Sequence, residues 1–220
     1  TNTRSWYPSS LLNHLSSIRV CEKTLHNITL SRLSLPLASL RRLQSLDLER
    51  SPIALNDIAS VVTPTAYPNL RDLDLDFESL TLTSTEVDTV VSVFTDFGQA
   101  GHEFERVAVR NVPVTDSQFL DLYNGLLQPS TATLRRLLVG GWTTGGSLTD
   151  AVIDEIATLE NLEELEIIGQ DLTSIDGLGV LPNLVELELN DMMSLTDFSD
   201  LASLGTLRSL DVGLTRYGAA

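Results

Sequence analysis

An apolar motif with a fixed spacing recurs in the C-terminal part of the chain, at residues 162–167, 184–189 and 207–212. In each segment leucine, isoleucine or valine fills the first, fourth and sixth positions. The residues at the fourth position, Leu165, Leu187 and Leu210, are 22 and 23 residues apart. A repeat of this length and pattern predicts stacked units that each contribute one short strand and a return segment. We therefore expect an elongated array with one continuous core.

Five earlier segments carry the same motif, and their first residues are Leu25, Leu43, Leu70, Phe104 and Leu134. They bring the number of firm units to eight, preceded by a degenerate unit that begins at Leu15. The spacing between successive firm units rises from 18 to 34 residues and falls to 23 at the end. These boundaries predict an N-terminal cap or linker at 1–14, a single repeat domain at 15–214 and a tail at 215–220.

The long central units have room for a helix on the return path. Between residues 75 and 104, apolar residues at helical spacing are Val87, Val90, Val91, Phe94 and Phe97, and the other long gaps show a similar pattern. Hydroxyl side chains that could cap these helices are Ser84 or Thr85, Thr115 and Thr149. The predicted fold class is α/β: a solenoid with a curved parallel sheet on its concave side and helices and irregular turns on its convex side.

Charged residues dominate the strand positions that point away from the core. Side chains alternate along a strand, so motif positions three, five and seven are expected on the concave face. Read along the array, this face is acidic, then basic, then acidic. The candidate binding residues on it are Asp72, Asp74, Asp76, Arg106, Arg110, Arg136, Glu164, Glu166, Glu186 and Glu188.

The four glutamates among these candidates are expected to form a square of carboxylates, because parallel strands lie about 4.8 Å apart. A sheet built only for stability avoids stacking like charges. One interpretation is a surface that receives Lys or Arg side chains of a protein partner. The other is the chance placement of acidic residues on the exposed strand positions of an acidic protein.

The overall charge supports a protein partner with a basic patch. The chain has 30 acidic and 14 basic residues, a formal net charge of −16. Such a chain repels nucleic acid and anionic membrane surfaces, although carboxylates that merely keep the protein soluble explain the same charge. Cys21 is the only cysteine, so an intramolecular disulfide is excluded. This favours a cytoplasmic location over a secreted one.

The sequence gives little support for catalysis, metal or cofactor binding. His14, His26 and His102 are scattered and show no metal-ligand spacing. Three alternate aspartates on one strand make a poor cage for a divalent ion. The glycine-rich segment 140–146 lacks the lysine that ends a phosphate-binding loop. We therefore expect no enzyme, no metal and no cofactor.

Two further residues are candidates for recognition. Trp142, in the glycine-rich segment, is an aromatic of the kind that anchors binding surfaces, although packing over a neighbouring unit is the alternative. Asn27 begins an Asn-Ile-Thr triplet, the acceptor pattern for N-glycosylation. Glycan on Asn27 is expected only if the protein is secreted.

The repeated motif resembles that of the leucine-rich repeat superfamily over about residues 15–214. The long central units are similar to the ribonuclease-inhibitor-like class, and the segments 68–73 and 133–137 resemble the repeat portions of F-box proteins. No F-box helical bundle is visible in residues 1–24, and the asparagine expected after each strand is mostly absent. The resemblance implies a non-enzymatic protein-binding scaffold. The alternative is a secreted recognition protein that binds carbohydrate or another neutral ligand.

Overall fold

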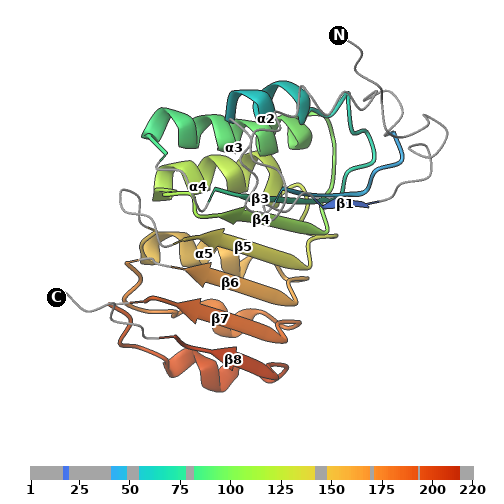
Figure 1. The fold of residues 1–220 in the computed structure, drawn as a ribbon. Coiled ribbons are helices and arrows are strands. Elements are labelled where there is room, and N and C mark those ends of the chain that lie inside the picture. Colours follow the sequence, from blue (N-terminus) through green and yellow to red (C-terminus); the bar gives the residue numbers. More distant parts are fainter. Residues whose placement is uncertain are drawn as a thin grey trace, which may run out of the picture.

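The computed structural model describes residues 17–19, 41–48, 55–77, 82–141, 148–168, 171–192 and 194–213. Within them, eight strands form one parallel sheet in chain order (Figure 1). The strands are β1 (Ser17–Arg19), β2 (Ser45–Leu48), β3 (Asp72–Asp76), β4 (Arg106–Arg110), β5 (Arg136–Gly140), β6 (Glu164–Ile168), β7 (Glu186–Asn190) and β8 (Ser209–Asp211). Each unit returns the chain to the same side before the next strand begins, which keeps neighbouring strands parallel.

Helices occupy the return segments, and the longest one described lies in a central unit. They are α2 (Leu55–Val61), α3 (Ser84–Gln99), α4 (Asp116–Leu122), η3 (Tyr123–Leu127), η4 (Asp150–Val152), α5 (Ile153–Ala157), η5 (Leu178–Val180) and η6 (Ser199–Ser203). The prediction that the long central units contain true helices is confirmed. Within the described ranges, no helix is both long enough and apolar enough to cross a membrane.

The N-terminus of α3 lies one residue earlier than the sequence predicted. Its N-cap is Thr83, not Ser84 or Thr85. The Thr83 hydroxyl accepts from the Glu86 backbone N–H at 3.4 Å, and Glu86 accepts from the Thr83 N–H at 2.8 Å. This reciprocal arrangement needs Glu or Gln three residues after the cap. Glu86 supplies it for Thr83, which selects Thr83 over its neighbours.

The other two predicted caps are confirmed and also connect neighbouring units. Thr115 forms the same capping box with Gln118, and Thr149 accepts from the Ala151 N–H at 3.3 Å. Thr149 in turn donates its hydroxyl and its backbone N–H to Asp116 of the preceding unit, at 2.7 and 2.8 Å. The helix side of the array is therefore held by polar contacts as well as by apolar packing.

The core runs the length of the array between the sheet and the helices. Residues at motif position four stand in register from strand to strand and are at most 4% exposed from β2 to β7; they are Leu46, Leu73, Val107, Leu137, Leu165 and Leu187. Phenylalanines Phe94, Phe97, Phe104 and Phe119 fill the wider central units. Burying side chains of this size stabilises the fold by about 1.5–3 kcal/mol each.

A row of side-chain hydrogen bonds holds the turns that precede the strands. The asparagine that usually follows each strand in such repeats is mostly missing. The residue immediately before motif position one donates its side chain to a backbone carbonyl of the preceding unit at Asn69, Thr133, Asn161, Asn183 and Thr206. The bond from Asn183 to the Glu160 carbonyl is 2.9 Å, and that from Thr206 to the Leu184 carbonyl is 2.8 Å. Carbonyls at the array edge are thus satisfied by amides or hydroxyls, whichever the unit offers.

The first part of the array is described at β1 and from residue 41 onward. The degenerate unit that begins at Leu15 forms β1, and Ser17 of β1 pairs directly with Ser45 of β2. The firm unit predicted to begin at Leu25 lies outside the described residues.

Candidate functional site

One face of the sheet is covered by the helices, and the opposite face carries motif positions three, five and seven (Figure 1). We call the second face the polar face. Strand register aligns its residues in rows across the sheet. Position three gives the row Asp72, Arg106, Arg136, Glu164 and Glu186, and position five gives the row Asp74, Ala108, Leu138, Glu166, Glu188 and Asp211.

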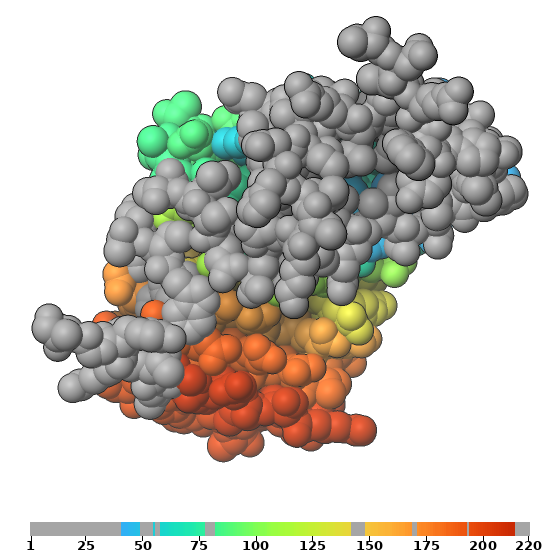
Figure 2. All heavy atoms as spheres, in the orientation of Figure 1, coloured from blue at the N-terminus to red at the C-terminus, as the bar shows by residue number. Residues whose placement is uncertain are grey.

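The structure thus brings the predicted charged candidates together on one face. Asp76 and Arg110 belong to a third row, at position seven. Trp142 and the predicted glycosylation site Asn27 lie outside the described residues. In the space-filling view, the C-terminal units that carry the glutamates make up the lower part of the molecule, coloured orange to red (Figure 2).

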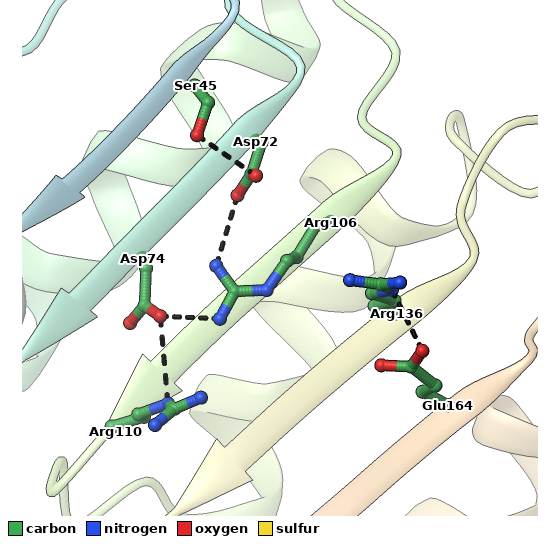
Figure 3. A network of polar contacts seen from close by, with 7 residues as sticks. All are labelled: Ser45, Asp72, Asp74, Arg106, Arg110, Arg136 and Glu164. Carbon is green, nitrogen blue, oxygen red and sulfur yellow. Dashed lines mark hydrogen bonds and ion pairs between the residues drawn. The ribbon is translucent and has the colours of Figure 1, made fainter. Parts of the chain in front are cut away.

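Charges of opposite sign pair with one another on β3 and β4 (Figure 3). Arg106 Nη1 donates to Asp72 Oδ1 at 3.1 Å, and Arg106 Nη2 donates to Asp74 Oδ2 at 2.5 Å. Ser45 donates to the other oxygen of Asp72 at 3.0 Å. Arg110 Nε lies 3.7 Å from Asp74 Oδ2, an ion-pair distance beyond hydrogen-bond range. The acidic and basic strands therefore neutralise each other within the chain.

Asp74 and Asp76 are buried, at 3% and 6% exposure. The prediction that positions three, five and seven line an open surface is wrong for these two residues. Arg106 and Arg110 reach from β4 to Asp74, because their side chains are longer than the strand spacing of about 4.8 Å. Burial raises the pKa of Asp74, and the ion pairs with Arg106 and Arg110 oppose that shift.

Asn111 is a residue of this face that the sequence analysis missed. Its side-chain amide donates to Asp76 Oδ1 at 2.6 Å, and its backbone N–H donates to the Gly140 carbonyl at 2.7 Å. Its φ of 55° is a left-handed conformation that asparagine adopts more readily than most residues. Asn111 lies outside the motif positions. The signal that could have found it is a turn-forming residue directly after a strand.

The pairing of charges stops at the boundary between β5 and β6. Arg136 Nε lies 3.1 Å from Glu164 Oε1. Beyond this pair, Glu166, Glu186 and Glu188 form no ion pair and accept no hydrogen bond within the part of the chain that the structure describes. The C-terminal half of the polar face therefore carries carboxylates without counterions.

These carboxylates stand side by side on neighbouring strands. Glu164 pairs in register with Glu186, and Glu166 with Glu188, as the motif predicted. Asp211 of β8 continues the row beside Glu188. We call Glu166, Glu186, Glu188 and Asp211 the acidic ladder. Among the described residues, no three His, Cys, Asp or Glu side chains are placed to share a metal ion, so the ladder offers negative charge without a coordination cage.

The environment of the ladder disfavours its charged form. Burial raises the pKa of Glu166, and the charge of Arg110 partly opposes this shift. Burial also raises the pKa of Glu188, and the negative charges of Glu186 and Asp211 raise it further. A cation bound at the row offsets the repulsion between the carboxylates and favours their charged form.

A hollow of about 200 Å³ lies between the paired and the unpaired half of the polar face. It is lined by three arginines of β4 and β5 and by four glutamates of β6 and β7, with Leu138 among its apolar residues. It is a shallow site with cations on one side and carboxylates on the other.

Comparison with known proteins identifies the fold. No protein-family model matches the chain, and no curated protein matches its sequence. Among solved structures, internalin C2 of Listeria monocytogenes superposes with a TM-score of 0.52 at 19% identity, over 94% of this chain and 84% of that one. The internalin inlF of the same bacterium gives a TM-score of 0.51 at 20% identity, over 92% of this chain and 62% of that one. Similarity at this level of identity concerns the fold alone, and with the recurring motif and the in-order parallel sheet it shows that the chain has the leucine-rich repeat fold.

Proposed function

We propose that the chain is a non-enzymatic scaffold that binds a protein partner on its polar face, through basic side chains that the partner presents to the acidic ladder. The observation that carries this proposal is the set of unpaired carboxylates on three neighbouring strands. Like charges directly opposite each other on paired strands cost about 0.2–1 kcal/mol per pair. A partner with Lys or Arg side chains removes this repulsion on binding, so the stability lost in the free protein is recovered in the complex.

The dimensions of the polar face are consistent with a protein partner. Eight strands at about 4.8 Å spacing span about 34 Å, and strands of five residues are about 16 Å long. A specific interface covers about 800 Å² on each partner, somewhat more than this rectangle. The partner is therefore expected to contact the turns at the strand ends as well as the sheet.

The chemistry of the face supports binding rather than catalysis. His102, the one histidine among the described residues, packs edge-on against Phe97 at 5.1 Å between ring centroids, within the helix side of the array. The ladder carboxylates lie on a shallow surface, and acid–base catalysis needs a positioned proton donor and acceptor around a bound substrate. Electrostatic capture of a cationic surface needs only the charge that is present.

The test is affinity capture with three forms of the chain from an extract of its source organism. The first is the wild type, and the second carries Glu186→Lys and Glu188→Lys. The third carries Glu103→Lys and Asp121→Lys, which reverse exposed carboxylates on loop and helix positions and change the net charge equally. Each capture is made at about 0.05 M and about 0.5 M salt, a range over which exposed ion pairs become strongly screened.

We expect a basic protein to bind the wild type and the control variant at low salt, and to be lost from the ladder variant. Retention of the same proteins by all three forms would show that binding does not use the ladder. Retention that is equally reduced in the ladder and control variants would show that only net charge matters, and the proposal would then be wrong.

A further inference from the structure

Arg110 is the cation of the polar face whose hydrogen-bonding groups are least satisfied. Arg106 donates to two aspartates, and Arg136 has a close contact with Glu164. Arg110 has only the 3.7 Å ion pair with Asp74, and its Nε is buried without a hydrogen-bond acceptor. A guanidinium group has five N–H donors, and among the described residues none of those on Arg110 is hydrogen bonded.

The carboxylates nearest to Arg110 across the hollow do not satisfy it. Arg110 influences the charges of Glu166 and Glu188, yet it forms no ion pair within 4 Å with either residue. The reason is the strand order. Arg110 is on β4, Glu166 on β6 and Glu188 on β7, so their backbones are about 10 and 14 Å apart.

The hollow therefore presents an unsatisfied cation and unsatisfied anions at fixed separation, with Leu138 between them. A ligand with only positive charge satisfies one side and is repelled by the other. Alternate residues of an extended peptide lie on the same face about 6.8 Å apart. With the reach of their side chains, an acidic and a basic residue at this spacing cover the distance between Arg110 and the ladder.

We propose that the hollow recognises an extended segment of the partner in which an acidic residue and a basic residue are two positions apart. The acidic side chain contacts Arg110, and the basic side chain contacts Glu166 and Glu188. This inference rests on the proposed function, because it specifies which protein segment binds the polar face. It adds a requirement for an acidic group, which attraction by the net charge of −16 cannot explain.

The experiment uses two short blocked peptides and the intact, isotope-labelled chain. In the first peptide every second residue is threonine. The residues between are aspartate and arginine alternately, so that aspartate and arginine are two positions apart. The second has asparagine in place of aspartate and is purely basic. Backbone amide signals of β4–β7 are followed by NMR during titration of the wild type and of the Arg110→Gln, Glu188→Gln and Arg71→Gln variants. Arg71 is the control, because its exposed ion pair with Glu105 lies outside the hollow. Thermal unfolding confirms that each variant is folded.

We expect the mixed-charge peptide to bind about fivefold more weakly to both the Arg110→Gln and the Glu188→Gln variant, the factor that one exposed ion pair provides. The basic peptide should lose affinity only in Glu188→Gln, and Arg71→Gln should change neither titration. If both peptides shift the ladder signals and Arg110→Gln affects neither, the requirement for an acidic residue is wrong while the proposed function stands. If neither peptide shifts those signals, both are overturned.

Discussion

The two halves of the polar face use the same strand positions in opposite ways. On β3 and β4, motif positions three and five hold two aspartates and Arg106, which are paired within the chain. On β6, β7 and β8, the equivalent positions hold four glutamates, Ser209 and Asp211. Of these carboxylates only Glu164 is ion-paired, with Arg136, within the described residues. The backbone register is the same in both halves. The difference therefore comes from side-chain charge alone, and it separates a half that stabilises the fold from a half that is available to a partner.

The largest effect is expected from breaking the paired half. In the Asp74→Ala variant Arg106 loses one of its two carboxylates and Arg110 loses its only ion pair among the described residues. Removing one partner of a buried pair costs about 3–5 kcal/mol. Arg106 is partly exposed and keeps Asp72, so we expect a loss near the lower limit, about 3 kcal/mol, measured by urea unfolding.

The control for this prediction is Asp72→Ala on the same strand. Its side chain is 31% exposed, compared with 4% for Asp74, so a loss of about 1 kcal/mol is expected. The double variant Asp74→Ala, Arg106→Met should lose less unfolding free energy than the sum of the two single variants. The reason is that methionine at position 106 has no charge that needs a partner. Equal losses for Asp72→Ala and Asp74→Ala would contradict the assignment of Asp74 as the central residue of this half.

In the unpaired half, we expect removal of charge to increase the unfolding free energy instead of lowering it. Glu186→Gln with Glu188→Gln removes repulsion along the acidic ladder while keeping side-chain size. We expect the free chain to gain up to about 1 kcal/mol in unfolding free energy. The matched control is Glu103→Gln with Asp121→Asn at exposed positions elsewhere, where a change within about 0.5 kcal/mol is expected. A clear loss of stability in the ladder variant would mean that these glutamates are satisfied within the chain.

The sequence was sufficient for the fold because one motif predicts strand, face and register together. From the unit at Leu43 onward, residues at equal motif positions are neighbours on adjacent strands, as the pairing of Leu73 with Val107 shows. The unit predicted from Leu25 lies outside the described residues and stays a prediction. The resemblance to the repeat portions of F-box proteins stays a prediction.

The polar face was predictable in composition but not in its interactions. The motif placed Asp72 opposite Arg106, so their contact could have been derived from the sequence. The diagonal contact from Arg106 to Asp74, and the burial of Asp74 that accompanies it, depend on side-chain conformation. Asn111 was missed because its role comes from a left-handed backbone after the strand, which no apolar motif encodes.

The contribution of the unpaired half to stability depends on pH. The raised pKa values of Glu166 and Glu188 mean that the folded chain binds more protons than the unfolded chain at pH values above the usual glutamate pKa of about 4.3. Stability contributed by these groups therefore increases as the pH falls through that range. We expect the advantage of Glu166→Gln with Glu188→Gln over the wild type to shrink between pH 7 and about pH 5, measured by chemical unfolding at both pH values.

Carboxylates that accept hydrogen bonds at turns and caps make stability depend on pH in the opposite direction. The pKa values of Glu86 and Asp197 are lowered by hydrogen bonds from Thr83 and Ser199. Their stabilising effect is present above the usual carboxyl pKa and is lost at lower pH. The wild type and the glutamine variant share these groups, so their difference isolates the ladder. A constant difference from pH 7 to about pH 5 would show that Glu166 and Glu188 titrate alike in the folded and unfolded chain.

The smallest effect is expected from ion pairs outside both halves, at the strand entrances. Arg71 and Glu105 lie 3.2 Å apart, and both side chains are more than half exposed. Exposed pairs contribute about 0.2–1 kcal/mol at most and are screened by salt. We expect Glu105→Gln to change the unfolding free energy by less than about 0.5 kcal/mol, and less still at high salt. The backbone carbonyl of Glu105 accepts from Arg135 and Arg136 and is unaffected by the substitution. A loss as large as that of Asp74→Ala would mean that charge pairing stabilises this array everywhere, and the division of the polar face into a structural and a binding half would lose its basis.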